Sequence, residues 1–179
     1  MHFTARFFIS HYMKSAEYYI ENLNLTKHPE GGYYREVYRS AETINAEVLD
    51  SGMRGERNIS TSIYYLLSGN DVSNFHRIKS DEIWHHYDGC PVRIFVIDQS
   101  GSIKEFLVGK NIVDGESIQL TIPKGCWFCA ELVDKNSFAL VSCTVAPGFD
   151  FTDFELAVRE ALLIEFPLHR ELIIKFTKE

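Results

Sequence analysis

The chain has 179 residues, with 18 Lys and Arg against 25 Asp and Glu, which gives a net charge of −7. Its residues are 45% apolar and 24% charged, an ordinary composition for a soluble globular protein. The negative balance argues against nucleic acid as a partner, because such binding relies on cations that neutralise phosphates. No polybasic segment indicates a membrane anchor. We find no linker-like break in composition, and therefore predict a single domain over residues 1–179.

The apolar stretch from Phe3 to Ile9 is interrupted by Arg6 and is too short for a signal-peptide core or a membrane-spanning helix. We therefore expect a cytoplasmic protein. In that compartment the four cysteines are expected to be reduced, buried thiols. Cys126 and Cys129 have the spacing of a zinc-binding pair, but the sequence offers no second pair, so we interpret them as packing residues.

The chain begins with a predicted helix and continues as strands. Apolar residues at helical spacing predict a helix from Ser15, a suitable N-cap, to Asn24. A turn at residues 29–32 leads into a strand from Tyr33 to Arg39, and polar residues 41–57 are predicted to form a long loop. Eight more strands are predicted at Ile59–Leu67, Ser73–Ile78, Glu82–Tyr87, Val92–Ile97, Ile103–Val108, Ser117–Ile122, Phe128–Val133 and Phe138–Val145, and the last of these is expected to be central.

Two helices are predicted after the strands, over about residues 153–177. Thr152 to Glu155 matches a capping box, and Pro167 suits the first turn of a second helix that ends at Phe176. Strands at this spacing, with no helix between them, indicate an antiparallel sandwich or barrel over about residues 30–146. The predicted fold class is therefore mainly β, with one N-terminal and two C-terminal helices.

The segment from Ser73 to Gly89 carries the candidate chemistry. If a tight turn is centred on Lys79, His76 lies opposite Glu82 on the same face of a hairpin, with Cβ atoms about 5 Å apart. An imidazole and a carboxylate that converge inside a barrel form a usable acid–base unit. On a solvent-facing hairpin the same two residues would be an ordinary surface pair.

The surrounding motifs resemble those of the cupin superfamily. The first cupin motif, His-x-His, then Glu, then Gly, is matched in spacing by His76, Ile78, Glu82 and Gly89, and the second, Pro-x-Gly-x-x-His, by residues 123–128. Further segments at residues 29–36, 61–67, 81–85 and 145–149 resemble a branch of unknown function that is similar in fold to the dTDP-4-keto-sugar 3,5-epimerases. The resemblance implies a jelly-roll barrel and, since cupins commonly pair through their sheets, a homodimer.

The departures from the cupin pattern bear on metal binding. A typical metal-binding cupin uses three His and one Glu, whereas Ile78 and Phe128 stand at two of the His positions here. Only His76 and Glu82 remain as ligands, and His86 is about 13 Å along the strand from Glu82. The sequence does not place His28, a possible loop donor. We therefore expect no cofactor, with a divalent metal possible but disfavoured.

The resemblance to the epimerases gives His76 a role as the base that removes a carbon-bound proton. Glu82 would then orient the imidazole, and a tyrosine would return the proton, with Tyr33, Tyr65 and Tyr87 as candidates. A small polar ligand, sugar-like or nucleotide-linked, would contact the predicted ligand-binding residues Trp84, His86, Phe128, Tyr33 and Tyr65, although the aromatic ones can equally be core residues. Two alternatives to this isomerase or epimerase remain: a binding module without turnover, and a metal-dependent cupin oxygenase or isomerase.

Overall fold

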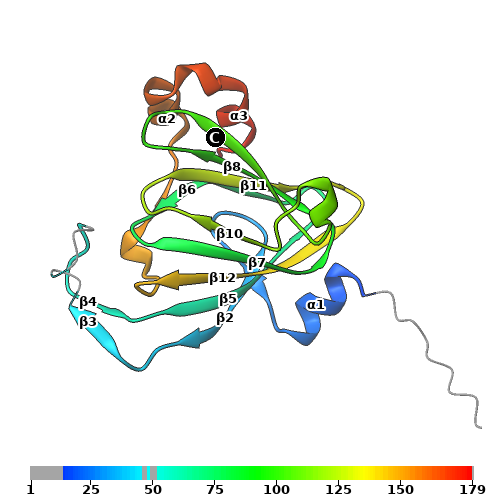
Figure 1. Cartoon of the computed structure of the whole chain (residues 1–179), viewed down its shortest axis with the longest axis horizontal. Helices are drawn as coiled ribbons and strands as arrows, with labels where there is room; N and C mark the ends of the chain where they lie inside the picture. Colours follow the sequence, from blue (N-terminus) through cyan, green and yellow to red (C-terminus); the bar gives the residue numbers. More distant parts are fainter. Residues whose placement is uncertain (1–13, 46–47, 49–51, 179) are drawn as a thin grey trace, which may run out of the picture.

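The structure is a computed structural model that describes residues 14–45, 48 and 52–178. Two antiparallel sheets face each other as a jelly roll (Figure 1). The six-stranded sheet has the order β1 (Thr26–Lys27), β2 (Tyr33–Arg39), β5 (Thr61–Ser68), β12 (Phe138–Ala146), β7 (Asp81–Gly89), β10 (Gln119–Ile122). The five-stranded sheet has the order β13 (Phe154–Leu156), β6 (Val72–Ile78), β11 (Trp127–Leu132), β8 (Val92–Ile97), β9 (Ile103–Val108).

A short two-stranded ladder and several helices complete the fold. The ladder consists of β3 (Thr43–Asn45) and β4 (Glu56–Asn58), which continue the β2–β5 pair beyond the main sheet (Figure 1). The helices are α1 (Ala16–Asn22), α2 (Arg159–Glu165) and α3 (Arg170–Lys175), and the 3-10 turns are η2 (Ile112–Asp114), η3 (Phe151–Asp153) and η4 (Pro167–His169). None of the helices in the described part of the chain is long and apolar enough to cross a membrane.

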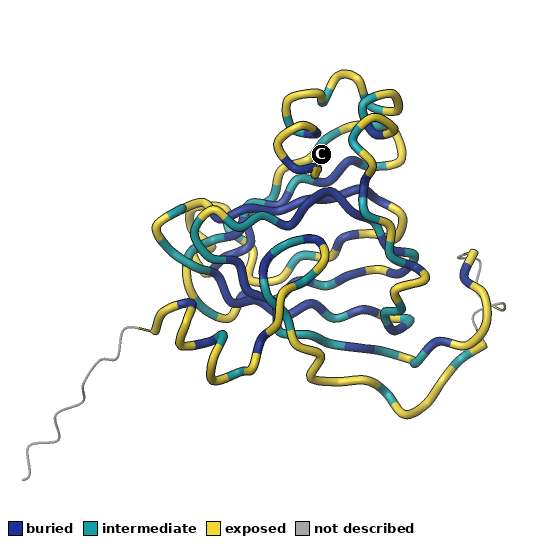
Figure 2. The backbone as a smooth tube through the Cα atoms, turned by 180° about the vertical axis from the view of Figure 1, so that it is seen from behind, coloured by how far each residue is buried: buried dark blue, intermediate teal, exposed yellow. Residues whose placement is uncertain are grey.

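Apolar side chains form three buried clusters that explain the layers. The largest lies between the sheets and includes Trp84, Phe128 and Val141. A second joins the five-stranded sheet to α2 and α3, where Phe176 packs on Phe75, and a third holds α1 against β5 and β12. Buried segments accordingly follow the strands, whereas much of the terminal helices and of β2 is exposed (Figure 2).

The predicted mainly β jelly roll with one helix before it and two after it is confirmed. Most strands begin and end within two residues of their predicted bounds, and β12 lies between β5 and β7, buried as expected. The four cysteines form no disulfide, and Cys126 and Cys129 are buried. The apolar stretch at residues 3–9 lies outside the described residues.

Two element predictions are wrong. The predicted loop at 41–57, parts of which lie outside the described residues, contributes β3 and β4. The predicted capping box does not begin a helix either: Asp150 accepts hydrogen bonds from the backbone and hydroxyl of Thr152, which closes η3. Phe154 is extended and pairs with Ile78 as part of β13. The backbone groups of Phe154–Leu156 are instead satisfied by pairing with the edge of β6, so the helix starts only at Arg159.

Candidate functional site

A cavity of about 420 Å³ lies between the two sheets. Its volume falls in the usual range for small-molecule sites. Three of the predicted site residues line it: His76, Glu82 and Tyr65. The other lining residues are His28, Glu30, Tyr34, Glu36, Arg39, Thr61, Ile63, Ile78, Cys143, Val145, Phe149, Asp150, Phe151 and Phe154.

A tight turn between β1 and β2 positions Glu30 in the cavity wall. Gly31 has φ +124°, and a Cβ there would lie 1.9 Å from the carbonyl oxygen of Val72, so the turn requires glycine to approach β6 this closely. The Glu30 carbonyl accepts hydrogen bonds from the backbone N–H of Asn74 at 2.9 Å and from its side-chain amide at 2.5 Å. The Ser73 hydroxyl donates to Oε1 of Glu30 at 2.9 Å. These contacts fix the turn on β6 and orient the Glu30 carboxylate.

His76 is a buried imidazole whose two nitrogens face different partners. Nδ1 lies 2.8 Å from the carbonyl oxygen of Asn74, and because a carbonyl only accepts, Nδ1 carries a hydrogen. In the neutral ring, Nε2 therefore holds the lone pair, and it lies 3.2 Å from Oε2 of Glu30. Burial lowers the pKa of His76, although the charge of Glu30 opposes this shift. His76 is thus a neutral base beside a carboxylate that stabilises its protonated form.

Glu30 supplies a permanent negative charge at neutral pH. Burial raises the pKa of this carboxyl, but the positive charge that His76 carries when it is protonated, the contact with His28 and the hydrogen bond from Ser73 together lower it to about 2. Nδ1 of His28 lies 3.3 Å from Oε2, the same oxygen that faces His76. One carboxylate oxygen therefore lies against two imidazole rings.

Glu82 reaches the cavity from the opposite sheet. The prediction that it faces His76 across a β6–β7 hairpin is wrong, because β6 pairs with β11 and β13 while β7 pairs with β12 and β10. The chain crosses between sheets after Ile78, which gives each strand two partners. Among the described residues, no ion pair or hydrogen bond joins the two side chains. Burial, together with the charge of Glu30, raises the pKa of Glu82 to about 8, so this carboxyl is protonated at neutral pH.

The tyrosines considered as acids differ in position. Tyr65 lines the cavity, but its hydroxyl donates to the Gly31 carbonyl at 2.9 Å, and burial raises its pKa well above 10. Tyr33 lies outside the lining, with the Lys27 ammonium 3.7 Å from its ring centroid. Tyr87 is also outside it and 46% exposed. Tyr65 therefore supports the turn at Gly31.

The remaining predicted ligand-binding residues, Trp84, His86 and Phe128, lie outside the cavity lining. Trp84 and Phe128 are buried in the core between the sheets, and the Phe128 ring packs 4.0 Å from the His76 ring, centroid to centroid. His86 is buried with Nε2 3.0 Å from the Cys90 carbonyl. Trp84 and Phe128 thus support the cavity lining from the core, because Trp84 packs on Tyr65 and Phe128 packs on His76.

Sequence reasoning did not assign Glu30 or the aromatic residues that follow β12. Glu30 was part of a predicted turn, where a carboxylate is usually solvated. The signal that could have identified it is the glycine pair Gly31 and Gly32, which lets the turn approach another strand. Phe151 and Phe154 were assigned to a region before or within a predicted helix. Their arrangement at the cavity depends on β13, which the sequence did not predict.

Two facing antiparallel sheets with a cavity between them are the architecture of a cupin-type jelly roll. The model of one cupin superfamily family, described as DUF985, matches residues 17–157, and the chain belongs to this family. It is 34% identical over 148 residues to the uncharacterised protein YML079W of Saccharomyces cerevisiae, covering 78% of this chain and 73% of the yeast protein.

Solved structures agree with this assignment. A hypothetical protein from Leishmania major has a TM-score of 0.84 and 35% identity, covering 93% of this chain and 100% of that one. Protein SO0799 from Shewanella oneidensis has a TM-score of 0.83 and 37% identity, covering 93% and 99%. Oxalate decarboxylase from Bacillus subtilis has a TM-score of 0.52 at 20% identity, covering 86% of this chain and 37% of that one, which shows a shared fold alone.

Metal centres occur in this fold, since Mn(II) centres are described for the Bacillus oxalate decarboxylase. Among the described residues, no group of three or more His, Cys, Asp or Glu side chains is arranged to hold a metal ion. The apolar side chains of Ile78 and Phe128 stand at two of the expected ligand positions, with Phe128 packed directly on His76.

Proposed function

We propose that the protein is a metal-free isomerase or epimerase that transfers a proton at a carbon next to a carbonyl group of a small polar ligand. The observation that carries this proposal is the His76–Glu30 pair, with Nε2 3.2 Å from Oε2, in a cavity that also contains the buried Glu82. The cupin family assignment is compatible with this chemistry but does not specify it.

In the proposed step, Nε2 of His76 removes the proton from the carbon, and the electron pair of the C–H bond moves into an enolate. Glu30 stabilises the resulting imidazolium. It takes the role of partner to His76 that the sequence analysis gave to Glu82. Glu82, protonated at neutral pH, donates its proton to the carbon from the other side. The two groups stand on opposing sheets, a placement that supports removal and return on opposite faces of the carbon.

Deuterium exchange tests this proposal. A thermal-shift screen of keto-sugars first identifies ligands that raise the melting temperature. Those ligands are then incubated with the protein in deuterium oxide, and NMR follows solvent deuterium entering the carbon next to the carbonyl. We expect exchange with the unmodified protein and at least a hundredfold loss with His76→Asn, since general base catalysis contributes about 10²–10⁴-fold.

His86→Asn is the matched control, because His86 is a buried imidazole outside the cavity lining. It should keep the exchange rate within a few-fold. If ligands stabilise the protein without exchange, and His76→Asn binds them as tightly as the unmodified protein, His76 is not a base and the protein is a binding module.

A further inference from the structure

The charged groups of the cavity lining are mostly acidic. Glu30, Glu36 and Asp150 are carboxylates, and Glu82 is neutral below about pH 8. Arg39, the single guanidinium among the described lining residues, forms an ion pair with Glu36 that cancels the charge of both. Glu30 and Asp150 therefore carry the net negative charge of the lining. A ligand that carries its own negative charge would therefore enter a site of like charge and low dielectric, where repulsion between charges is strong.

Arg39 is not available to compensate an anion. Its Nε donates to Oε1 of Glu36 at 2.9 Å and its Nη2 donates to Oε2 at 2.6 Å, a bidentate pair. Nη1 donates to Asn58 at 2.7 Å, and Nη2 also donates to the carbonyl of Phe149 at 3.2 Å. The guanidinium is neutralised and oriented by these protein partners.

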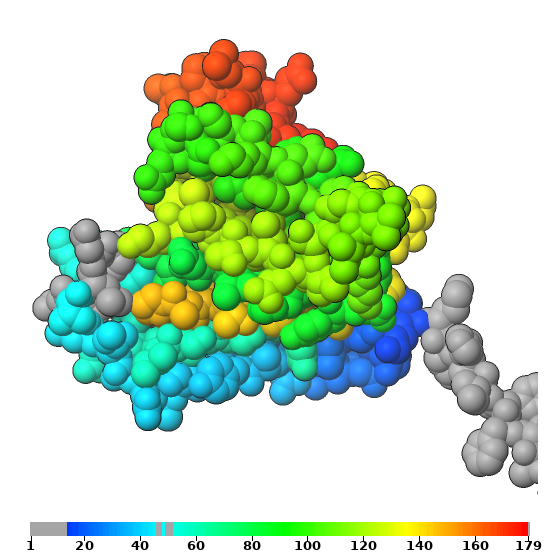
Figure 3. Space-filling view, in the orientation of Figure 1, coloured from blue at the N-terminus to red at the C-terminus, as the bar shows by residue number. Residues whose placement is uncertain are grey.

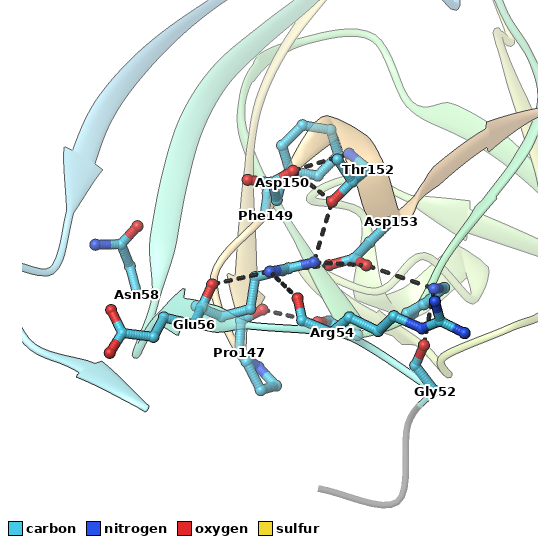
Figure 4. Close-up of polar contacts among 12 residues, drawn as sticks. Gly52, Arg54, Glu56, Asn58, Pro147, Phe149, Asp150, Thr152 and Asp153 are labelled. Atoms are coloured by element: carbon cyan, nitrogen blue, oxygen red, sulfur yellow. Dashed lines mark hydrogen bonds and ion pairs between the residues drawn. The ribbon is translucent and has the colours of Figure 1, made fainter. Parts of the chain in front are cut away.

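The nearby Arg57 is likewise engaged. Its Nε and Nη2 donate to both carboxylate oxygens of Asp153, at 2.6 and 3.0 Å. Nη2 also donates to the Thr152 hydroxyl, and Nη1 donates to the carbonyls of Arg54 and Glu56 (Figure 4). These bonds hold η3 in place, so the second arginine near the cavity has a structural role.

One side of the cavity is a wall of aromatic rings. Phe151 is 52% exposed, its ring centroid lies 5.0 Å from that of Phe149, and it stacks on His28 at 6.3 Å with an interplanar angle of 25°. Further in, the Phe154 ring lies 5.5 Å from the His76 ring. This row of rings leads from an exposed edge to the buried base.

We propose that the cavity binds an uncharged or cationic ligand with a flat ring, and discriminates against ligands that carry a carboxylate or phosphate. The ring packs on the wall formed by Phe149, Phe151 and Phe154, and the polar end of the ligand meets His76 and Glu82. This inference rests on the cavity of the proposed function, but not on turnover there. It disfavours the nucleotide-linked ligands expected from the sequence, whose phosphates add negative charge.

Three ring compounds of nearly equal size test the charge preference: benzamide, benzamidine and benzoate. Ligand-observed NMR titrations at pH 7 and low salt measure the dissociation constant of each with the full chain. We expect benzamide and benzamidine to bind, and benzoate to bind at least tenfold more weakly than benzamide. Asp150→Asn, at the half-buried rim, should reduce this difference several-fold.

Phe151→Ala tests the ring wall, and we expect it to weaken benzamide and benzamidine alike by at least fivefold. Tyr87→Ala is the control, because Tyr87 is a similarly exposed aromatic residue outside the lining. Benzoate binding as tightly as benzamide, no binding by either benzamide or benzamidine, or equal effects of Phe151→Ala and Tyr87→Ala would each overturn the inference. Deuterium exchange is measured separately from these dissociation constants. A result that refutes the charge preference therefore does not decide whether His76 is a base.

Discussion

Burial shifts the pKa values of His76 and Glu82 in opposite directions, so at neutral pH His76 is deprotonated and Glu82 is protonated. Burial disfavours the charged form of either group, so it lowers the pKa of the imidazole and raises that of the carboxyl. Glu30 is the exception, since its partners keep it ionised. The cavity therefore presents a free base and a protonated acid at the same pH, the combination that a proton-transfer site needs.

The raised pKa of Glu82 predicts that the contribution of this group to stability falls as the pH rises. The folded state holds a proton up to about pH 8 that the unfolded state releases near pH 4.5. Between these values this group lowers the free energy of unfolding by about 1.4 kcal/mol per pH unit. The lowered pKa of His76 acts in the opposite sense below about pH 6.5, so the unmodified protein and Glu82→Gln are compared by urea unfolding at pH 5, 6, 7 and 8. The difference between their free energies of unfolding should change with this slope. An exposed control, Glu160→Gln, should keep the slope, whereas equal slopes in all three proteins would refute the shift.

The replacement of two expected ligands by Ile78 and Phe128 predicts a low metal content. Elemental analysis of purified protein should find well under one equivalent of iron, manganese, zinc and nickel per chain, because no group of three or more His, Cys, Asp or Glu side chains among the described residues is arranged to hold a metal ion. Dialysis against a chelator should leave the melting temperature unchanged. One equivalent of metal per chain that disappears in His76→Ala would contradict this prediction and favour a metal-dependent cupin.

At the scale of elements, the turn that carries Glu30 is the most sensitive support of the site. Gly31→Ala places a Cβ 1.9 Å from the Val72 carbonyl in a left-handed backbone, so the turn must move away from β6. We expect a loss of about 1–3 kcal/mol in the free energy of unfolding, measured by urea denaturation, together with weaker deuterium exchange. Gly115→Ala is the matched control: Gly115 has φ +86° with nothing within 4 Å of an added Cβ. A similar loss in both variants would show that the contact with Val72 is unimportant.

The same elements show what could be predicted from the sequence. Alternation and turn residues located the strands, because those signals are local. They did not show whether β6 and β7 share a sheet, since a short turn at Lys79 suits both a hairpin and a crossing between sheets. The sequence thus placed His76 and Glu82 in one site, but as neighbours across a hairpin, whereas they face each other from opposite sheets. Glu30 is 46 residues from His76 along the chain, and its approach depends on packing that local patterns do not encode.

At the scale of the whole molecule, one edge of the six-stranded sheet remains incompletely covered. β1 pairs with β2 only at Tyr33 and Tyr34, and in the part of the chain that the structure describes no strand covers that edge of residues 35–39. Val37 and Tyr38 on this edge are 44% and 54% exposed. The edge lies at the end of the molecule opposite α2 and α3 (Figures 1 and 3). An open apolar edge favours pairing with another strand.

We therefore expect a homodimer in which the β2 strands of two copies pair antiparallel around a two-fold axis. Sedimentation velocity at micromolar concentration should give a dimer for the unmodified chain and a monomer for the double variant Val37→Lys with Tyr38→Lys, because paired strands would bring these cations together. Leu168→Lys, on η4 at the opposite end and 93% exposed, is the matched control and should remain dimeric. Since Glu36 and Arg39 of β2 line the cavity, dimerisation at this edge would also place the partner beside the cavity mouth. A monomeric unmodified chain, or a double variant that stays dimeric, would exclude this interface.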